Sequence, residues 1–329
     1  MSGLSPRAAV ALALVLLVLL ALPLAANSYL VSVAVVALFA AYFGQAWNIM
    51  TGFAGQLSLG HALYVGLGAY AAAALFTHWG VSPWLGMVAG MAVAGVAGAF
   101  IAALSFRFRV GGVYFALLTI AFAEFTRILF DHFPWVGSTE GLFLPVKNLD
   151  HDDPLNLSGS PAMFYYLLLA LTLAALALSQ HLLHRRAGYY WQAIREDEEA
   201  ARALGIDVFR YKVAAMALSA AMTALGGGFL AFYDKNLYPD TSFAIGRSVD
   251  IITAPIIGGL GTLIGPILGA FVLTGLGETM TWATDAFGII GLKQFVYGAA
   301  LLAIVVFQPA GLWPWLKRLA RFDAATPRR

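Results

Sequence analysis

Long apolar stretches alternate along the chain with short polar or glycine-rich segments. A helix that crosses a lipid bilayer needs about 20 mainly apolar residues. Ten stretches approach this length and predict helices at 7–25, 29–50, 61–78, 84–105, 111–131, 162–183, 212–233, 245–258, 262–281 and 292–309. The eighth is short for a full crossing, and the sequence GGLGTLIGP follows it at once. It is therefore interpreted either as a short span or as a half-helix that re-enters the membrane.

The composition favours a chain that is dissolved in lipid. Hydrophobic residues make up 61% of its 329 positions and charged residues 11%, and the mean hydropathy is +0.81. A soluble domain carries about 25% charged residues, so this chain has too few to cover a surface that faces water. We predict a single all-α, polytopic membrane domain over residues 1–329, with about 10 spanning helices (8–10), some of them short or broken.

The first apolar stretch can be interpreted in two ways. The segment LPLAAN, residues 22–27, has the small residues of a signal-peptide cleavage site. The stretch before it is about 18 residues long, which is closer to a membrane span than to the apolar core of a signal peptide. We therefore expect a retained first helix.

The distribution of basic residues predicts the orientation. Lysine and arginine concentrate on the cytoplasmic side of a membrane protein. With ten spans and both termini in the cytoplasm, the inner segments hold fourteen of the nineteen lysines and arginines. These inner segments carry Arg7, Arg107 and Arg109 and include a loop at 184–212 and a tail at 313–329, and the longest outer loop lies at 132–161.

Several classes of chemistry have no support in the sequence. The chain has no cysteine, and its six histidines show no metal-ligand spacing. It has no GxxxxGK[ST] loop for phosphate, and the net charge of +2 argues against a nucleic-acid partner. We predict no catalytic residues, no metal site and no cofactor in this chain.

Two glycine-rich segments interrupt the apolar pattern: GFAGQLSLGHALYVGLGAY at 52–70 and IIGGLGTLIGPILGAF at 256–271. Glycine weakens a helix by about 1 kcal/mol relative to alanine, and it also lets two helices pack closely. The segments therefore indicate either tight packing or broken helices along a transport pathway. The candidate helix-breaking glycines are Gly55, Gly60, Gly258, Gly259, Gly261 and Gly265, and the candidate pathway residues are Asn48, Gln56, Ser58, His61 and Glu124.

Glu124 lies three residues before Arg127 in the fifth stretch, so the two side chains share a helix face and can pair. Charged side chains within a membrane usually face the bundle interior. The pair can serve as a structural contact between helices, or Glu124 can belong to a transport pathway.

The inner segment 184–212 is strongly charged and predicts one amphipathic helix at about 191–204, which ends before Gly205. Its apolar face would hold Trp191, Ile194, Ala201 and Leu204, and its polar face would pair Arg195 with Glu199 and Glu198 with Arg202. A helix that rests on lipid headgroups usually has a basic face, whereas this one is acidic. A groove on a partner protein is favoured, contacted by Arg195, Glu196, Asp197, Glu198, Glu199, Ala200, Ala201 and Gly205.

The chain resembles the permease subunits of bacterial ABC importers for branched-chain amino acids, in particular the M-type member of the usual permease pair. Four segments carry the resemblance, which extends over nearly the whole chain: AGQLSLGHALYVGLGAY (54–70), GGVYFALLTIAFAE (111–124), AIREDEEAARALGIDVFRYK (193–212) and GGLGTLIGPILGAF (258–271). Glu199, Ala200 and Ala201, followed by Gly205, are similar to the family's coupling-loop pattern. The segment GSTEGL at 137–142 has fewer glycines than the family pattern suggests.

The resemblance implies a multi-pass protein of the bacterial inner membrane that contacts lipid and is not itself an enzyme. It implies four partners: a homologous permease, two cytoplasmic ATPase subunits that bind ATP and Mg, and a periplasmic binding protein. Three alternatives stay open. They are an importer of the same family that carries urea or short amides, a stand-alone secondary transporter, and a membrane enzyme.

Overall fold

A computed structural model of the chain describes residues 6–145, 152–287 and 310–319, together with a few positions between 295 and 308. Most of the span expected at 292–309 and most of the tail at 313–329 therefore lie outside the described residues. The long helices, in chain order, are α1 (Pro6–Ala25), α2 (Ser28–Asn48), α3 (Ala62–Trp79), α4 (Pro83–Arg107), α5 (Gly112–Asp131), α6 (Pro161–Leu183), α9 (Val208–Asp234), α11 (Ile245–Gly258) and α12 (Gly265–Phe287). Each of the nine expected stretches before residue 282 coincides with one of them, and most ends agree within a few residues.

Shorter elements connect the long helices. They are η1 (Ile49–Phe53), a π-helix that extends α2; the 3-10 helices η2 (Pro134–Val136) and η3 (Ser138–Glu140); and the helices α7 (Arg186–Glu196), α8 (Glu198–Ala203), α10 (Pro239–Ser242) and α14 (Leu312–Leu319). Two strands of two residues each, β1 (Leu142–Phe143) and β2 (Asn236–Leu237), pair antiparallel, with Leu142 opposite Leu237. The prediction of an all-α chain holds apart from this short pair.

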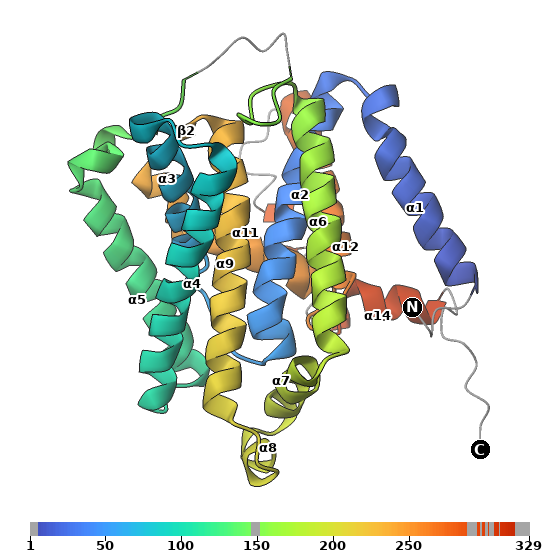
Figure 1. Ribbon diagram of the computed structural model, residues 1–329. Helices are drawn as coiled ribbons and strands as arrows, with labels where there is room; N and C mark the ends of the chain where they lie inside the picture. The colour runs from blue at the N-terminus through green and yellow to red at the C-terminus, as the bar shows by residue number, and fades with distance from the viewer. Residues whose placement is uncertain are drawn as a thin grey trace.

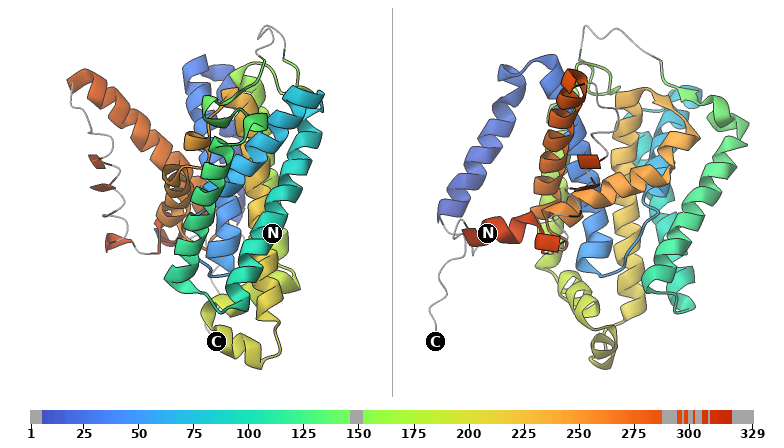
Figure 2. Two further views of the ribbon diagram at one scale, coloured as in Figure 1. Left: turned by 90° about the vertical axis from the view of Figure 1, so that its left-hand side faces the viewer. Right: turned by 180° about the vertical axis from the view of Figure 1, so that it is seen from behind.

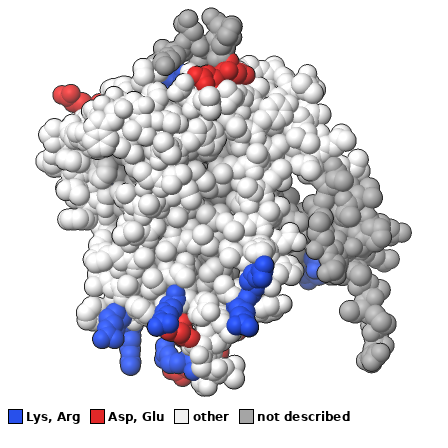
Figure 3. Space-filling model, in the orientation of Figure 1, with Lys and Arg blue, Asp and Glu red and all other residues white. Residues whose placement is uncertain are grey.

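Five helical segments of the described part are long and apolar enough to cross a membrane: 28–53, 83–107, 112–131, 161–183 and 208–234. The charge distribution agrees with such a position. Figure 3 shows lysine and arginine side chains gathered, together with some acidic ones, at the end of the molecule that carries α7 and α8, and mainly acidic side chains at the opposite end. Between the two ends, this face of the molecule is an uncharged belt, as hydrocarbon requires.

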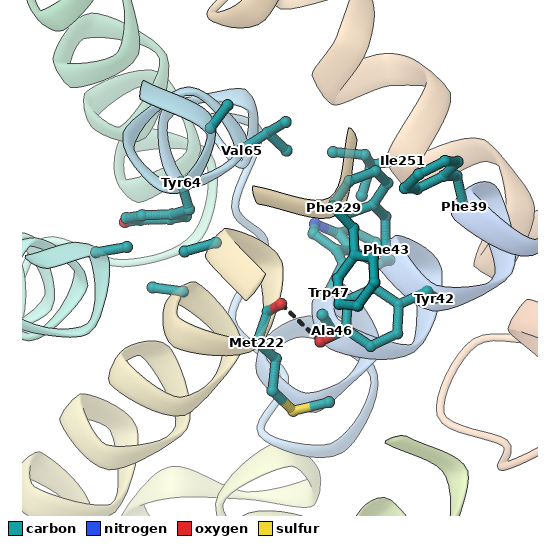
Figure 4. Close-up of a cluster of buried hydrophobic side chains, with 14 of the residues drawn as sticks. Phe39, Tyr42, Phe43, Ala46, Trp47, Tyr64, Val65, Met222, Phe229 and Ile251 are labelled. Atoms are coloured by element: carbon teal, nitrogen blue, oxygen red, sulfur yellow. Dashed lines mark hydrogen bonds between the residues drawn. The ribbon is translucent and has the colours of Figure 1, made fainter. Parts of the chain in front are cut away.

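The interior of the bundle lies between α2, α3, α4 and α9 (Figure 1). Small residues bring these helices together: a β carbon added at Gly68 of α3 would lie 2.0 Å from the Ala224 carbonyl oxygen of α9. Figure 4 shows the aromatic side chains of α2 packed against α9, where the Tyr42 hydroxyl donates a 2.8 Å hydrogen bond to the Met222 carbonyl oxygen. This part of the fold is a close-packed and largely apolar frame.

Two helices stand at the periphery, and one lies obliquely. In Figure 1, α1 and α5 lean away from the bundle on opposite sides. Helix α11 has only 14 residues and is strongly tilted relative to α2 and α9 (Figure 2). It ends at Gly258, and α12 starts at Gly265 and returns along α2 toward the end of the molecule from which α11 came. The short, tilted α11 followed by an interruption agrees with the expected half-helix.

Candidate functional site

The first glycine-rich segment is a break between two helices. Helix α2 widens into the π-helix η1, and the chain then has no helical structure until α3 begins at Ala62. Gly55 has φ +71°, in the left-handed region that favours glycine. The segment is held by its own side chains, since Trp47 Nε1 donates to the Ser58 carbonyl oxygen at 2.8 Å and Thr51 Oγ1 donates to the Gln56 carbonyl oxygen at 3.0 Å.

A chain of hydrogen bonds through His61 fixes this first break against α9. Ser219 Oγ donates to the Ala46 carbonyl oxygen at 2.7 Å, so it accepts from His61 Nε2 at 2.8 Å. His61 Nδ1 is then the acceptor of the Ser58 hydroxyl at 2.9 Å. The three side chains of Ser58, His61 and Ser219 are fully buried. The imidazole is thus a neutral ring with both nitrogens used inside the protein.

The second glycine-rich segment is also a break, between α11 and α12, and it meets the first. Asn48 Oδ1 accepts from the Gly261 backbone N–H at 2.9 Å, and Asn48 Nδ2 donates to the Thr262 carbonyl oxygen at 2.9 Å. Gln45 Nε2, one turn earlier on α2, donates to the Leu263 carbonyl oxygen at 2.5 Å. Two amide side chains of α2 therefore hold three successive residues of the second break.

The structure brings most of the predicted pathway residues together. Asn48, Ser58 and His61 are buried around the two breaks, and Gln56 is half-buried beside them. They form hydrogen bonds to protein groups: the Gln56 backbone N–H donates to the Met50 carbonyl oxygen at 3.1 Å. In this conformation the breaks are closed, well-bonded junctions. Their role in transport stays a prediction.

Glu124 lies elsewhere. Its side chain is 41% exposed on the peripheral helix α5 and accepts from Arg127 at 2.6 Å, and Arg127 also binds Asp131 at 2.8 Å and Asp240 of α10 at 2.6 Å. The expected pairing with Arg127 is confirmed, and the bond to Asp240 links α5 to α10, as a structural contact between helices would. The pair lies at the periphery of the bundle, and a role of Glu124 in a transport pathway stays a prediction. The three-residue separation of Glu124 and Arg127 predicts that they share a helix face. It does not predict which helix or solvent that face contacts. The buried stripe of α5 runs instead through Phe115, Ala116, Thr119 and Ala123.

The charged segment consists of two short helices, so the prediction of one helix at 191–204 is wrong. Asp197 has extended backbone angles (φ −155°, ψ 111°), and its Oδ1 accepts from the backbone N–H groups of Glu199 and Ala200 at 2.9 and 3.0 Å. It thereby ends α7 and caps α8. We refer to α7 and α8 (186–203) as the α7–α8 hairpin; it lies at the lower end of the molecule in Figure 1.

The break at Asp197 changes the contacts expected along the segment. Arg195 does not pair with Glu199; it binds Glu196 at 3.0 Å, whereas the Glu198–Arg202 pair forms at 2.9 Å as expected. Trp191, Ile194 and Ala201 are buried, as predicted for the apolar face. Leu204 is 81% exposed, contrary to that prediction, because α8 ends at Ala203 and the chain turns away there. Gly205 follows with φ +83°, which agrees with the predicted helix end.

A buried lysine anchors the hairpin to the bundle. Only 4% of the surface of Lys212, in α9, is exposed. Its ammonium group forms an ion pair with Glu198, and Nζ lies 4.9 Å from the centre of the Phe106 ring. The ring face and the carboxylate together compensate the buried charge. Glu199, Ala200, Arg202 and Gly205 remain exposed at the tip. The tip is therefore a polar surface on a firmly attached base.

Arg195 points inward, toward the breaks. Its Nη1 donates to the Gly52 carbonyl oxygen of η1 at 2.7 Å. Three groups of this junction were missed by sequence reasoning, namely Gln45, Gly52 and Ser219. The Gln45–Asn48 spacing of three, which puts two amides on one helix face, was a usable signal for the first of them. Nothing in the local sequence marks Ser219, which lies in an apolar helix far along the chain.

Comparison with known proteins gives a consistent picture. The family model described as "Branched-chain amino acid transport system / permease component" matches residues 29–305. The chain is similar to the high-affinity branched-chain amino acid transport system permease protein LivM of Salmonella typhimurium, with 27% identity over 320 residues, which cover 91% of this chain and 73% of that protein. The LivM protein of Escherichia coli is 27% identical over 305 residues, which cover 86% and 70% of the two chains.

A relative of a different description is also similar. The autoinducer 2 import system permease protein LsrC of an Enterobacter species is 28% identical over 241 residues, which cover 70% of this chain and 64% of that protein. No solved structure matches the chain.

Proposed function

The chain belongs to the family of permease components of branched-chain amino acid transport systems, and from this premise we propose that it is a permease subunit of an ATP-driven importer in the bacterial inner membrane. Its partners would be a homologous permease, two cytoplasmic ATPase subunits that bind ATP and Mg, and a periplasmic binding protein. The chain itself hydrolyses nothing, and surrounding lipid contacts its apolar belt.

The observation that carries the proposal is the α7–α8 hairpin. It is the longest polar segment between two long helices at the basic end of the described structure, and its tip exposes Glu199, Ala200 and Gly205. Basic residues mark the cytoplasmic side of a membrane protein. A compact polar helix pair on that side suits a groove on a cytoplasmic protein. We assign the tip as the contact with an ATPase subunit.

The base of the hairpin supports the same function. Arg195 contacts η1, and the chain therefore connects a cytoplasmic surface to the two helix breaks through one side chain. Polar groups and interrupted helices within a membrane are typical of transport pathways. Closure of the ATPase pair would move the hairpin, and the breaks would rearrange as the transporter alternates between its two open states.

The cargo we propose is a branched-chain amino acid. The family description and the two LivM relatives support this choice. The LsrC relative, whose name refers to autoinducer 2, supports a second candidate. The described residues around the breaks are closed by hydrogen bonds, so selection among solutes would depend mainly on the separate binding protein.

The experiment that tests the proposal is purification of this chain from its host membrane, followed by reconstitution into liposomes with ATP inside. We expect an ATPase to co-purify, and we expect leucine uptake that depends on ATP. Uptake of autoinducer 2 in place of leucine would change the cargo and keep the mechanism. Leucine uptake without any ATPase would overturn the mechanism.

Charge reversal at the hairpin tip tests the assigned contact. Glu199→Lys should reduce co-purification of the ATPase about tenfold, equivalent to about 1.4 kcal/mol of binding. It should leave the free energy of unfolding unchanged within about 0.5 kcal/mol, because the side chain is exposed. The matched control is Glu140→Lys, an exposed acid at the opposite end, which should not change co-purification. Glu198 is unsuitable for this test because it binds buried Lys212. Equal effects of the two lysine variants would contradict the assignment.

A further inference from the structure

Arg195 differs from the other exposed, charged residues of the hairpin because it reaches a helix break. It lies at the C-terminal end of α7, its side chain is 37% exposed, and its Nη1 donates to the Gly52 carbonyl oxygen at 2.7 Å. Its second terminal nitrogen binds Glu196 of the hairpin at 3.0 Å. One side chain thus holds a group of the hairpin with one nitrogen and a backbone group of η1 with the other.

The bond to Gly52 is strong for a contact of a side chain with the backbone. Gly52 lies in the last turn of the continuous helix formed by α2 and η1, where carbonyl groups lack intrahelical partners and the helix dipole is negative. A guanidinium is permanently charged and presents its N–H groups in a rigid plane. It therefore caps this helix end with a charge-assisted hydrogen bond, about twice as strong as a neutral one.

The stem of Arg195 fits the first break at close range. A β carbon added at Gly55 would lie 2.7 Å from Arg195 Cγ and 3.0 Å from its Cα. These separations are too short for any side chain, so the backbone of the first break rests directly on the end of α7. The hairpin cannot approach the bundle at this point without pushing on residues 52–55.

The same guanidinium also borders the second break. A β carbon added at Gly261 would lie 2.4 Å from Arg195 Nη1 and 2.8 Å from the Gly52 carbonyl oxygen. Gly261 is in turn held by Asn48, which lies one turn before Gly52 on the same helix. Arg195, Gly52 and Gly261 consequently form one compact junction at which the hairpin, the first break and the second break meet.

We propose that Arg195 is a positioning residue that transmits movement of the α7–α8 hairpin to both helix breaks, through its bond to Gly52 and its contact with Gly261. This inference rests on the proposed function and refines it, because it assigns Arg195 to contact within the subunit and not to the ATPase surface. Displacement of the hairpin pulls the carbonyl of Gly52 and opens or closes the junction.

The test compares Arg195→Ala with Arg210→Ala in the complete transporter. Arg210 is a suitable control, because it is an exposed arginine at the same end of the molecule that forms an ion pair with Asp207 at 2.9 Å and lies outside the hairpin tip. The readout is leucine taken up per ATP hydrolysed in liposomes. We expect Arg195→Ala to lower this ratio at least tenfold while ATP hydrolysis and complex assembly persist, and Arg210→Ala to change it less than twofold. Arg195→Lys keeps a cationic donor at this position, so its leucine uptake per ATP should lie between that of Arg195→Ala and that of the parent.

A second readout does not depend on the cargo. The chain has no cysteine, so cysteines introduced at Leu57 and Leu260, which are 36% and 46% exposed beside the two breaks, can be labelled specifically with spin labels. The distance between the labels is measured in the assembled complex with and without ATP and vanadate. We expect an ATP-dependent change in the parent and in Arg210→Ala, and none in Arg195→Ala.

The outcomes separate the two proposals. Absence of ATP-driven uptake in the parent transporter overturns the proposed function. ATP-driven uptake that persists in Arg195→Ala at the parental ratio, with the distance change intact, overturns the inference alone. Arg195→Ala can also fail to give a folded complex. In that case, an undiminished uptake ratio in Arg195→Lys, together with no ATP-dependent distance change in the parent, would overturn the inference, because Arg195 would then serve stability only.

Discussion

The two helix breaks are held in different ways, although their sequences are alike. The first, at 54–61, is bonded internally through Trp47 and Thr51. Together with the start of α3, it is also bonded by Thr119, Ser219 and Ser248 of three other helices. The second, at 259–264, is bonded internally through Thr262 and is held by the two amides of a single helix, Gln45 and Asn48 of α2. We refer to the first break as the fixed corner, because side chains of three other helices bind it, whereas the side-chain bonds from other helices to the second break come from α2.

The difference has an energetic meaning. A buried group that loses its hydrogen-bond partner costs about 1–3 kcal/mol, so a loop tied to one helix by three bonds can be released from it at a cost comparable to that of a ligand or partner contact. A segment that is tied to several helices moves together with them or at a higher cost. We therefore expect changes at the first break to remove folded protein, and changes at the second to alter transport by molecules that still fold.

The largest effect is expected for Gly60→Ala in the first break. The new β carbon would lie 2.1 Å from the Thr119 carbonyl oxygen, which belongs to the backbone of α5 and cannot turn aside. We expect a loss of about 3 kcal/mol of stability, the upper part of the range for overpacking, measured as the thermal midpoint and the yield of monodisperse protein in detergent. Gly246→Ala, where no atom lies within 4 Å of the new carbon, is the control. A variant with parental stability would refute the fixed corner.

An intermediate effect is expected for Asn48→Leu, which removes the link from α2 to the second break. The Gly261 N–H and the Thr262 carbonyl would lose their partner, at a cost of about 2 kcal/mol. We expect uptake per folded molecule to fall more steeply than the yield of folded protein. Gln45→Leu should cost less, because it removes one bond and also an amide oxygen, Oε1, that accepts no hydrogen bond within the described part of the chain. If both variants reduced yield and uptake in proportion, the two breaks would be equivalent.

The smallest expected effect is the coupling between Gly261→Ala and Arg195→Ala. At Gly261 the backbone has φ +74°, where alanine costs about 1–2 kcal/mol, and the new carbon would lie 2.8 Å from the Gly52 carbonyl oxygen and 2.4 Å from Arg195 Nη1. We expect Gly261→Ala to lower both the yield of folded protein and the uptake per ATP. Combination with Arg195→Ala relieves the contact with Arg195, so the two changes should be partly non-additive in stability. Additive effects would indicate that Arg195 and Gly261 do not share a junction.

The course of the helices was predictable from the sequence, because the length of an apolar run sets the length of a spanning helix. The runs at 29–50 and 162–183 coincide closely with α2 and α6. Local signals were insufficient where one side chain redirects the backbone. Asp197 lies in an acidic run that resembles the polar face of a helix, yet its carboxylate bonds the next turn and ends α7.

The candidate site was predictable in composition but not in its connections. Glycines and polar residues marked both breaks, and the structure shows the helices interrupted there. The Asn48–Gly261 bond joins residues separated by 213 positions, and no local pattern encodes such a contact. Glu124 illustrates the converse, because a charge in an apolar stretch suggested the interior while α5 lies at the periphery.

Helix α2 is attached to α12 and its preceding break at two heights. Near the start of α2, the Tyr29 hydroxyl donates to Glu278 of α12 at 2.5 Å, and near its end Gln45 and Asn48 bind the turn that leads into α12. As long as these bonds persist, we expect α2 and α12 to tilt together. The residues of the first and second halves of this polypeptide would then move as one unit until the bonds of Gln45 and Asn48 break.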